Sequence, residues 1–451
     1  MAQNDPKSLE DKLRGYASAL EMLKTAPTGT YQHPVPEQYT HWMDEQEAWR
    51  KSAILFDQSF HMTDLYITGP DTKRLLAETS INNYEDWRPL KAFQYVATGH
   101  DGNLIADSIG YCLKDGSVNV VGKPPAANWL RFHAEREGLD VSFEEDRRIL
   151  ESNPRRKTFR LQLQGPAAPA ILEEANGGPL PETRPFGMCE FTIGGRPVTG
   201  LRHGMAGAPG MEFWGAFDDR EHVRATLERV GKNHGMLLGG RKSYLTASKE
   251  SGWIGALLPA IFSTPEMKNY REWLPASSFE ANMSIGGSLD APAIEGYYLD
   301  PWAVGYHRLI HWDHDFVGRD ALLAKRDDRH LKKVWLSWNR DDVLRIVGSL
   351  LDEGLPFKQF EWPYGEYGSC PYDKALVDGA PAGMSLYSFY SANSRSFMSM
   401  GLIREDLATD GAEVTVIWGD ADGGASKPMV PLHEATEVRA MISPKFRTRS
   451  R

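Results

Sequence analysis

Residues 201–215 read L-R-H-G-M-A-G-A-P-G-M-E-F-W-G. Gly204, Gly207 and Gly210 punctuate this stretch, and glycine lets a backbone turn tightly or approach a ligand closely because it has no Cβ atom. Glu212 follows between two apolar residues, so we expect its carboxylate to be at least half buried and to need donors. A ligand with two adjacent N–H groups in one plane would use both carboxylate oxygens. A glycine-rich hairpin with a solvated glutamate explains the same residues, since one such turn is a weak signal.

Length and charge narrow the class of protein. The chain has 451 residues, too many for one hydrophobic core, and we expect two or three domains. Its hydrophobic fraction of 41% and charged fraction of 25% are those of an ordinary soluble globular protein. The formal net charge of −10 at pH 7 argues against nucleic acid or an anionic membrane surface as a partner.

The three cysteines are far apart and form neither a metal-spaced pair nor a disulfide framework, which fits a reducing cytosol. The N-terminus lacks the apolar segment typical of a signal peptide, and the most apolar run, residues 253–262, is short and contains a proline. We therefore expect a cytoplasmic protein without a membrane-spanning segment. The run H-W-D-H-D at residues 311–315 looks metal-like, but alternation would split its ligands between two faces, so we expect no metal there.

Apolar periodicity predicts mixed helices and antiparallel strands before residue 325. The predicted helices cover residues 8–24, 37–51, 71–78, 126–137, 166–175 and 220–233. The predicted strands cover residues 62–67, 94–96, 104–112, 117–121, 158–164, 190–201 and 211–214, with a loop at 239–253.

A charge run, K-R-D-D-R-H-L-K-K at residues 325–333, indicates a domain boundary. Short strands dominate after it and favour a β-sandwich or a small barrel. They are predicted at residues 334–338, 382–390, 396–403 and 413–418.

Residues 53–71, A-I-L-F-D-Q-S-F-H-M-T-D-L-Y-I-T-G-P-D, resemble a signature of the glycine-cleavage T-proteins, or aminomethyltransferases. The likeness continues through G-N-L-I-A-D at 102–107 and L-Q-G-P at 163–166, and it covers nearly the whole chain. It implies an α+β, three-domain folate-binding fold with antiparallel sheets. Residues 1–325 would form two intertwined α+β subdomains that bind folate, and residues 326–451 a β-barrel or jelly-roll-like domain.

One branch of that superfamily is more similar: the tetrahydrofolate-dependent aryl O-demethylases that act on vanillate and syringate. Shared motifs are R-H-G-M-A-G-x-P-G at 202–210, P-A-A-N-W at 125–129, E-S-G-W at 250–253, Y-R-E-W-L-P-A at 270–276 and D-H-D-F at 313–316. The acid of the T-protein T-G-E motif is replaced here by Ala208, which argues against glycine cleavage.

The resemblance implies a tetrahydrofolate site. Glu212 matches the acid that holds the pterin edge, which presents an N–H and an NH₂ group side by side. Gln164 matches a second pterin contact, Trp253 an aromatic that packs against the cofactor, and Arg241 a further cofactor-binding position. Core packing explains Trp253 equally well.

The resemblance also implies the catalytic and substrate-binding residues. Tyr244 matches a catalytic tyrosine, and the ordinary pKa of tyrosine, about 10, suits proton transfer or hydrogen bonding at phenolic oxygens. Asp107 matches an acid near the reacting nitrogen, although a structural aspartate fits nearly as well. His61 is placed in both catalysis and the substrate pocket, and Tyr31 in that pocket. Without the resemblance, purely structural roles would explain these two residues: His61 as a buried histidine with its hydrogen bonds satisfied, and Tyr31 as a loop tyrosine.

Two departures bear on the substrate. Lys123 stands where benzoate demethylases carry an arginine, which keeps the charge but loses the bidentate fork, and His33 replaces a tyrosine. We expect a methoxylated aromatic acid as methyl donor and no lipoylated carrier protein. A dimethylsulfoniopropionate demethylase-like enzyme or a T-protein remains an alternative. A folate-binding iron–sulfur assembly factor ranks last, since no cysteine lies in a K-G-C-x-x-G-Q-E context.

Overall fold

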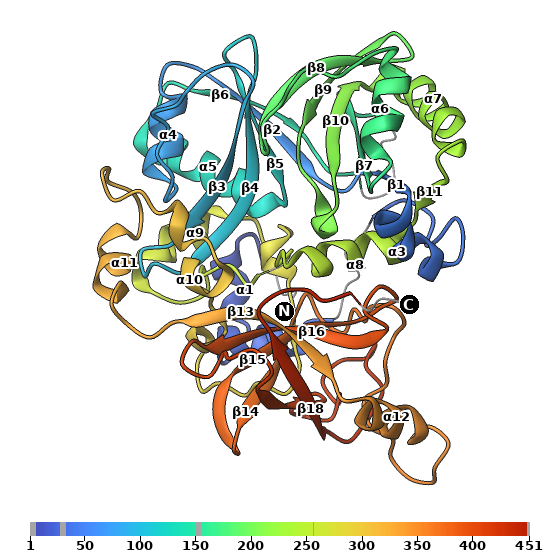
Figure 1. The fold of residues 1–451 in the computed structure, drawn as a ribbon. Helices are drawn as coiled ribbons and strands as arrows, with labels where there is room; N and C mark the ends of the chain where they lie inside the picture. The colour runs from blue at the N-terminus through green and yellow to red at the C-terminus, as the bar shows by residue number, and fades with distance from the viewer. Residues whose placement is uncertain (1–5, 28–32, 150–154, 256, 449–451) are drawn as a thin grey trace.

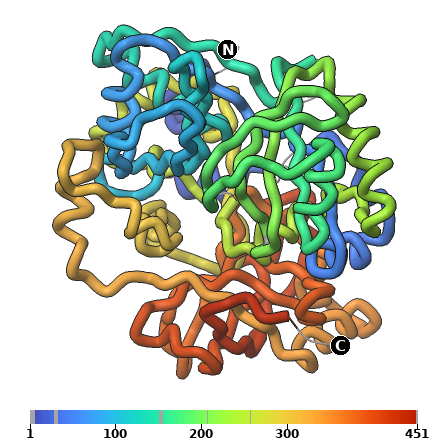
Figure 2. The backbone as a smooth tube through the Cα atoms, turned by 45° about the horizontal axis from the view of Figure 1, so that its top comes forward, coloured from blue at the N-terminus to red at the C-terminus, as the bar shows by residue number. Residues whose placement is uncertain are grey.

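The computed structural model describes residues 6–27, 33–149, 155–255 and 257–448, so Tyr31 of the expected substrate pocket lies outside the described residues. The described chain forms three β-sheets of five, six and seven strands. Figures 1 and 2 show the sheets as three lobes around a common centre. This is the α+β arrangement that the sequence predicts.

The five-stranded sheet forms the first lobe and is antiparallel throughout, in the order β3-β4-β5-β2-β6. Apolar residues that alternate along its strands pack against helix α5 (Pro124–Glu137), which is flanked by α4 (Thr72–Glu78). The strands are β2 (Thr63–Thr68), β3 (Lys91–Thr98), β4 (Leu104–Cys112), β5 (Val118–Gly122) and β6 (Ser142–Asp146).

The six-stranded sheet forms the second lobe, in the order β11-β1-β7-β10-β9-β8, and only its β1–β11 pair is parallel. One face is apolar and is covered by α6 (Ala168–Asn176) and α7 (Arg220–Lys232). The strands are β1 (Ala53–Asp57), β7 (Thr158–Gln164), β8 (Met188–Ile193), β9 (Arg196–Leu201), β10 (Gly210–Ala216) and β11 (Met236–Gly239).

The third lobe is a closed six-stranded barrel, because β14 pairs with both β15 and β17. Closure leaves no open edge, which decides between the two architectures expected from sequence in favour of the barrel. The barrel strands are β13 (Leu331–Trp338), β14 (Cys370–Val377), β15 (Ala380–Ser391), β16 (Ser396–Arg404), β17 (Glu413–Trp418) and β18 (Thr436–Ser443). The short β12 (Ile285–Gly286) pairs with β14 and lies outside the barrel. The domain boundary expected between residues 325 and 326 stays a prediction.

The remaining helices differ in position: α12 packs on the barrel strands β16 and β18, whereas α8 joins the barrel to the other lobes. Helix α8 crosses the centre of the molecule in Figure 1 and contacts both α3 and the barrel strand β15. These helices are α1 (Leu9–Leu13), α2 (Ala19–Thr25), α3 (Trp42–Lys51), α8 (Arg241–Ser251), α9 (Lys268–Trp273), α10 (Pro301–Val304), α11 (Arg319–Lys325) and α12 (Arg340–Gly348).

Three sequence predictions of local structure were wrong. The helix expected at residues 8–24 is two helices, because Ser8 and Ser18 each cap a separate N-terminus. The strand expected at 190–201 is a hairpin that turns at a pair of glycines with positive φ angles, 56° and 77°. The loop expected at 239–253 is helix α8, which ends at Gly252 in the left-handed conformation.

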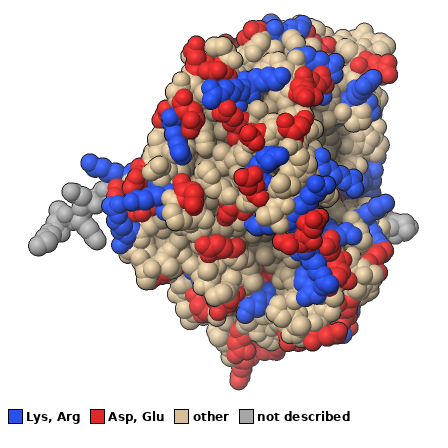
Figure 3. All heavy atoms as spheres, turned by 90° about the vertical axis from the view of Figure 1, so that its left-hand side faces the viewer, with Lys and Arg blue, Asp and Glu red and all other residues tan. Residues whose placement is uncertain are grey.

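Charge on the surface is mixed. On the face shown in Figure 3, basic and acidic side chains are interspersed over the lobes. Within the described ranges, helices fall short of the length and apolar character that a bilayer span requires.

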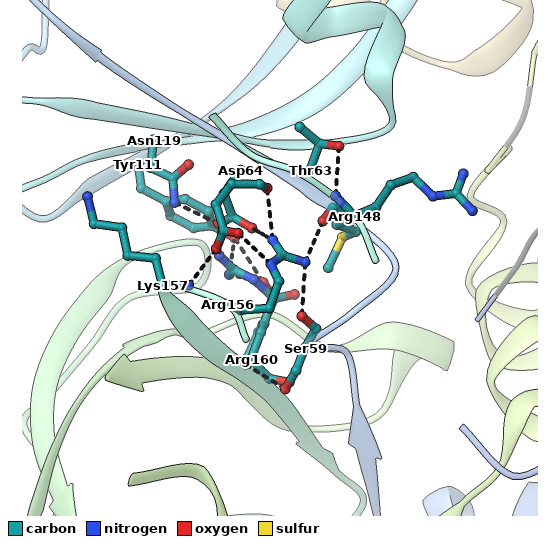
Figure 4. Close-up of polar contacts among 12 residues, drawn as sticks. Ser59, Thr63, Asp64, Tyr111, Asn119, Arg148, Arg156, Lys157 and Arg160 are labelled. Atoms are coloured by element: carbon teal, nitrogen blue, oxygen red, sulfur yellow. Dashed lines mark hydrogen bonds and ion pairs between the residues drawn. The ribbon is translucent and has the colours of Figure 1, made fainter. Parts of the chain in front are cut away.

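The first two lobes are joined by buried ion pairs, drawn in Figure 4. Arg160 on β7 lies 3.0 Å from Asp64 Oδ1 on β2 and 2.7 Å from Glu212 Oε1 on β10. Arg156 adds bonds to Asp64 and Asp146 at 2.8 and 2.9 Å. Since these groups are nearly all excluded from solvent, losing one partner leaves an uncompensated charge in the interior.

Replacing Arg160 with methionine is therefore expected to lower the free energy of unfolding by about 3–5 kcal/mol, because Asp64 and Glu212 both lose a partner. The exposed pair Arg74–Glu78 offers a control, and Arg74→Met should leave the free energy of unfolding nearly unchanged. Denaturant unfolding followed by circular dichroism measures both. Equal stability of the two variants would contradict a structural role for the buried bridge.

Candidate active site

The inner face of the six-stranded sheet is polar. Gln162 lies opposite Glu212, and Gln164 opposite Gly210, so the side chains of Gln162, Gln164 and Glu212 share the face away from α6 and α7. Gly210 is required at its position, since a Cβ atom there would lie 2.5 Å from the Leu163 carbonyl oxygen. The absent side chain lets β10 approach β7 closely beside Gln164.

Gln164 has an unmet hydrogen-bonding capacity. Its side chain is fully buried, and neither Oε1 nor Nε2 has a hydrogen-bond partner among the residues that the structure describes. Buried amides of native proteins are almost always bonded, so such a group marks a place where a ligand supplies the partner. An amide both donates and accepts, which suits a heterocycle edge.

Glu212 is buried, as its apolar neighbours predict, but its carboxylate is already half engaged. Oε1 accepts from Arg160 Nη1 at 2.7 Å and from Tyr111 Oη at 2.9 Å. No hydrogen bond from the described part of the chain reaches Oε2. The expectation that a ligand uses both oxygens therefore needs modification, because one oxygen is fixed by the protein and the other is left for a ligand.

A second group gathers Tyr244, His61 and His33. The Tyr244 hydroxyl lies 2.9 Å from His61 Nε2 and accepts from Gln58 Nε2 at 3.3 Å. The His33 ring lies 4.3 Å from the His61 ring and 4.6 Å from the Tyr244 ring, between centroids. Gln58 also donates to Gln162 Oε1 at 2.9 Å, which connects this group to the polar sheet face.

Both histidines are neutral near pH 7. Burial lowers the pKa of His33 to about 4, and burial together with the nearby charges of His33, Arg148 and Lys123 lowers the pKa of His61 well below its usual range. The Tyr244 hydroxyl donates to His61 Nε2 or accepts from it, according to which ring nitrogen of His61 carries the hydrogen. The arrangement holds a tyrosine hydroxyl beside an uncharged imidazole.

A third group is centred on Asp107 of β4. Its Oδ2 accepts from Tyr306 Oη at 2.5 Å and from Trp253 Nε1 at 2.9 Å. Burial raises the pKa of Asp107, and these two hydrogen bonds oppose the rise. Trp253 is 41% exposed, so the bond from its indole orients the ring while leaving much of it open to a ligand.

Lys123 caps the start of α5 and is partly buried. Burial lowers its pKa to about 8, and its charge acts on both His61 and Asp107. Lys123 therefore lies close to the second and third groups.

Arg241 is the first residue of α8, and its charge acts on His33 of the second group. It pairs with Glu366 at 2.7 Å and Glu37 at 3.5 Å, beside a cavity of about 360 Å³ between α8 and the barrel segment 361–367. Its role in cofactor binding stays a prediction.

Sequence reasoning missed four residues that orient the site: Gln58, Tyr111, Arg160 and Tyr306. A signal for Arg160 was present, since polar residues at 160, 162 and 164 alternate with leucines at 161 and 163. Such alternation in a central strand indicates a buried polar face. The other three needed the tertiary structure.

Three lobes around a buried polar centre define an aminomethyltransferase-like protein, and comparisons with known proteins agree. Residues 19–256 match the model of the GCVT N-terminal domain, and the chain belongs to this family. It is 39% identical to syringate O-demethylase of Sphingobium sp. (strain NBRC 103272 / SYK-6) over 97% of this chain and 95% of that protein. The resemblance read from the motifs is confirmed.

Two further comparisons extend the picture. The chain is 28% identical to sesamin methylene transferase of Sinomonas sp. (strain No.22), over 79% of this chain and 80% of that protein. The glycine cleavage aminomethyltransferase T of Bartonella henselae has the same fold, with a TM-score of 0.59, 15% identity and 93% of each chain covered.

Proposed function

We propose that this protein is a tetrahydrofolate-dependent O-demethylase that takes a methyl group from a methoxylated aromatic acid. The observation that carries the proposal is the 39% identity to a syringate O-demethylase along nearly the whole chain. The partly buried Tyr244–His61 pair, together with the unsatisfied Gln164 amide, supports it independently.

The described residues fit a pterin. Gln164 offers a donor and an acceptor, and Glu212 Oε2 offers a second acceptor on the same sheet face. The half-exposed Trp253 ring offers an apolar surface, held by Asp107. When bound, tetrahydrofolate supplies a secondary amine, nitrogen 5, as the methyl acceptor. Asp107, whose pKa is raised, is suited to hold a proton near that amine.

Tyr244 acts on the leaving group. Breaking an aryl ether releases a phenoxide, and a hydrogen bond to the departing oxygen lowers the barrier. Gln58 and His61 hold the Tyr244 hydroxyl, and its hydrogen is donated to the departing ether oxygen as negative charge develops there. His61 is neutral and adds no charge beside the Tyr244 ring.

The substrate pocket is assigned to Tyr31, His33, His61, Lys123 and Tyr244. Lys123 supplies a cation for the carboxylate of the aromatic acid, with the point-charge geometry of a lysine. His33 presents a neutral ring against the Tyr244 and His61 rings.

Purified protein incubated with tetrahydrofolate and syringate, vanillate or a related methoxybenzoate is expected to form 5-methyltetrahydrofolate and a phenolic product in equal amounts. Liquid chromatography with mass detection measures both products. Absence of methyl transfer from the whole panel would remove the substrate proposal, and turnover only with a lipoylated carrier would indicate glycine cleavage instead.

Tyr244→Phe is expected to lower kcat by about 10²-fold or more, because the hydroxyl acts in the transition state, while the Kd for tetrahydrofolate stays nearly unchanged. Tyr95→Phe is a matched control, since Tyr95 is a buried tyrosine bonded to Thr79 away from the site. Steady-state kinetics and calorimetry separate the two quantities. A Tyr244→Phe variant with normal kcat would show that the hydroxyl is not catalytic.

Gln164→Leu is expected to raise the Kd for tetrahydrofolate about tenfold or more without lowering stability, because the amide has no partner within the described protein. Gln162→Leu should lower stability, since the Gln162 amide accepts a hydrogen bond from Gln58 and donates one to the His203 carbonyl oxygen. Calorimetry and thermal unfolding give the two readouts. A destabilised Gln164→Leu variant with unchanged affinity would assign the amide a structural role.

A further inference from the structure

Lys249 is a buried cation that the proposed reaction does not use. It lies in the last turn of α8, and its side chain is 4% exposed. Among the residues that the structure describes, none forms a hydrogen bond or an ion pair with its ammonium group. Buried lysines are rare unless they are paired, so this group needs an acceptor.

The surroundings of Lys249 are aromatic. Its Nζ lies 4.3 Å from the centroid of the Tyr387 ring and 5.3 Å from that of Tyr364, both in the barrel lobe. Aromatic faces attract the cation but accept none of its three N–H groups in the manner of an oxygen. Burial and, to a lesser extent, the nearby charge of Lys123 lower the pKa of Lys249 to about 7, and Glu366 opposes this shift.

The chain contains a completed version of the same arrangement. Lys358, inside the barrel, lies 4.6 Å from the Tyr367 ring centroid and 4.9 Å from that of Trp418. Its ammonium also pairs with Asp420 Oδ2 at 2.8 Å. Two aromatic rings and a carboxylate therefore surround Lys358, whereas Lys249 has two rings and lacks the carboxylate.

The position of Lys249 is fixed on both sides. The next residue, Glu250, accepts from Trp49 Nε1 at 3.0 Å and from Ser391 Oγ at 2.6 Å, which anchors the end of α8 to the barrel. Tyr387 has a φ angle of 52° at a register shift between β15 and β16, a strained conformation for tyrosine. A strained backbone conformation persists only where the surrounding structure holds it. Here it accompanies the position of the Tyr387 ring beside Lys249.

We propose that Lys249 binds a carboxylate of a ligand in the central site, as a second cation beside Lys123. The inference rests on the proposed function, which supplies two ligands with this group. One source is the carboxylate of the aromatic acid, and the other is the glutamyl carboxylate of tetrahydrofolate. In either complex the ligand takes the place that Asp420 has beside Lys358.

The test compares Lys249→Met with the wild-type protein by calorimetry at about pH 6, below the pKa of the ammonium group. One arm uses a methoxybenzoate and its uncharged methoxybenzamide. The other uses tetrahydrofolate and a tetrahydropterin without the glutamyl tail. The variant should bind one of the two acids about tenfold or more weakly, and its uncharged counterpart within about twofold of wild type. The affected arm identifies the source of the carboxylate.

Lys358→Met is the matched control for removal of a buried lysine between two aromatic rings. It should lower stability, because Asp420 loses its partner, and leave the affinity for both acids unchanged. Lys249→Met should keep or raise stability, because no internal partner is lost.

Acid binding by Lys249→Met within twofold of wild type in both arms would overturn the inference and leave the proposed function intact. A wild-type protein that binds neither acid would overturn both. Equal weakening of an acid and its uncharged counterpart would also overturn the inference, because the effect would then come from altered packing and not from charge.

Discussion

The arrangement of the site depends on the guanidinium of Arg160. It bonds to Asp64 of one sheet and to Glu212 of the other, and it lies 5.3 Å from the Tyr111 ring centroid and 4.9 Å from that of Trp214. Each charge would be unstable alone in this interior, so the two sheets are held at the spacing that lets all three groups meet. Because the polar sheet face looks into the space between the lobes, the same bridge sets the geometry in which a ligand is bound.

The bridge also orients Glu212 before any ligand arrives. Two donors on Oε1 fix the plane of the carboxylate, and a ligand meets Oε2 in a defined direction. A group that is already ordered loses little entropy on binding. Gln164 differs, since its amide is buried without a partner in the described protein and must gain its hydrogen bonds from the ligand. The sheet face thus combines the carboxylate of Glu212, which is already oriented, with the amide of Gln164, which forms its hydrogen bonds only when a ligand is bound.

Local chemistry made much of this fold predictable and left its long-range contacts hidden. The apolar neighbours of Glu212 correctly indicated a buried carboxylate, but its partner Arg160 is 52 residues away along the chain. Helix α8 was missed because five of its six buried residues are serine, threonine, lysine or glutamate. These polar residues conceal the apolar periodicity that normally indicates a helix. Lys249 was also missed, because a lysine near a helix C-terminus is normally exposed to solvent and favoured by the helix dipole.

The site separates charge according to the chemistry proposed for each end of the aromatic acid. Around the Tyr244 hydroxyl the groups are neutral, because burial keeps His33 and His61 unprotonated. A cation there would stabilise phenoxide in the product as well as in the transition state, and so would slow release. The cations come from the ends of two helices, with Lys123 at the start of α5 and Lys249 at the end of α8, and the charge of Lys123 also acts on His61. If both hold one carboxylate, the point charges of two lysines, one from α5 and one from α8, act on it together.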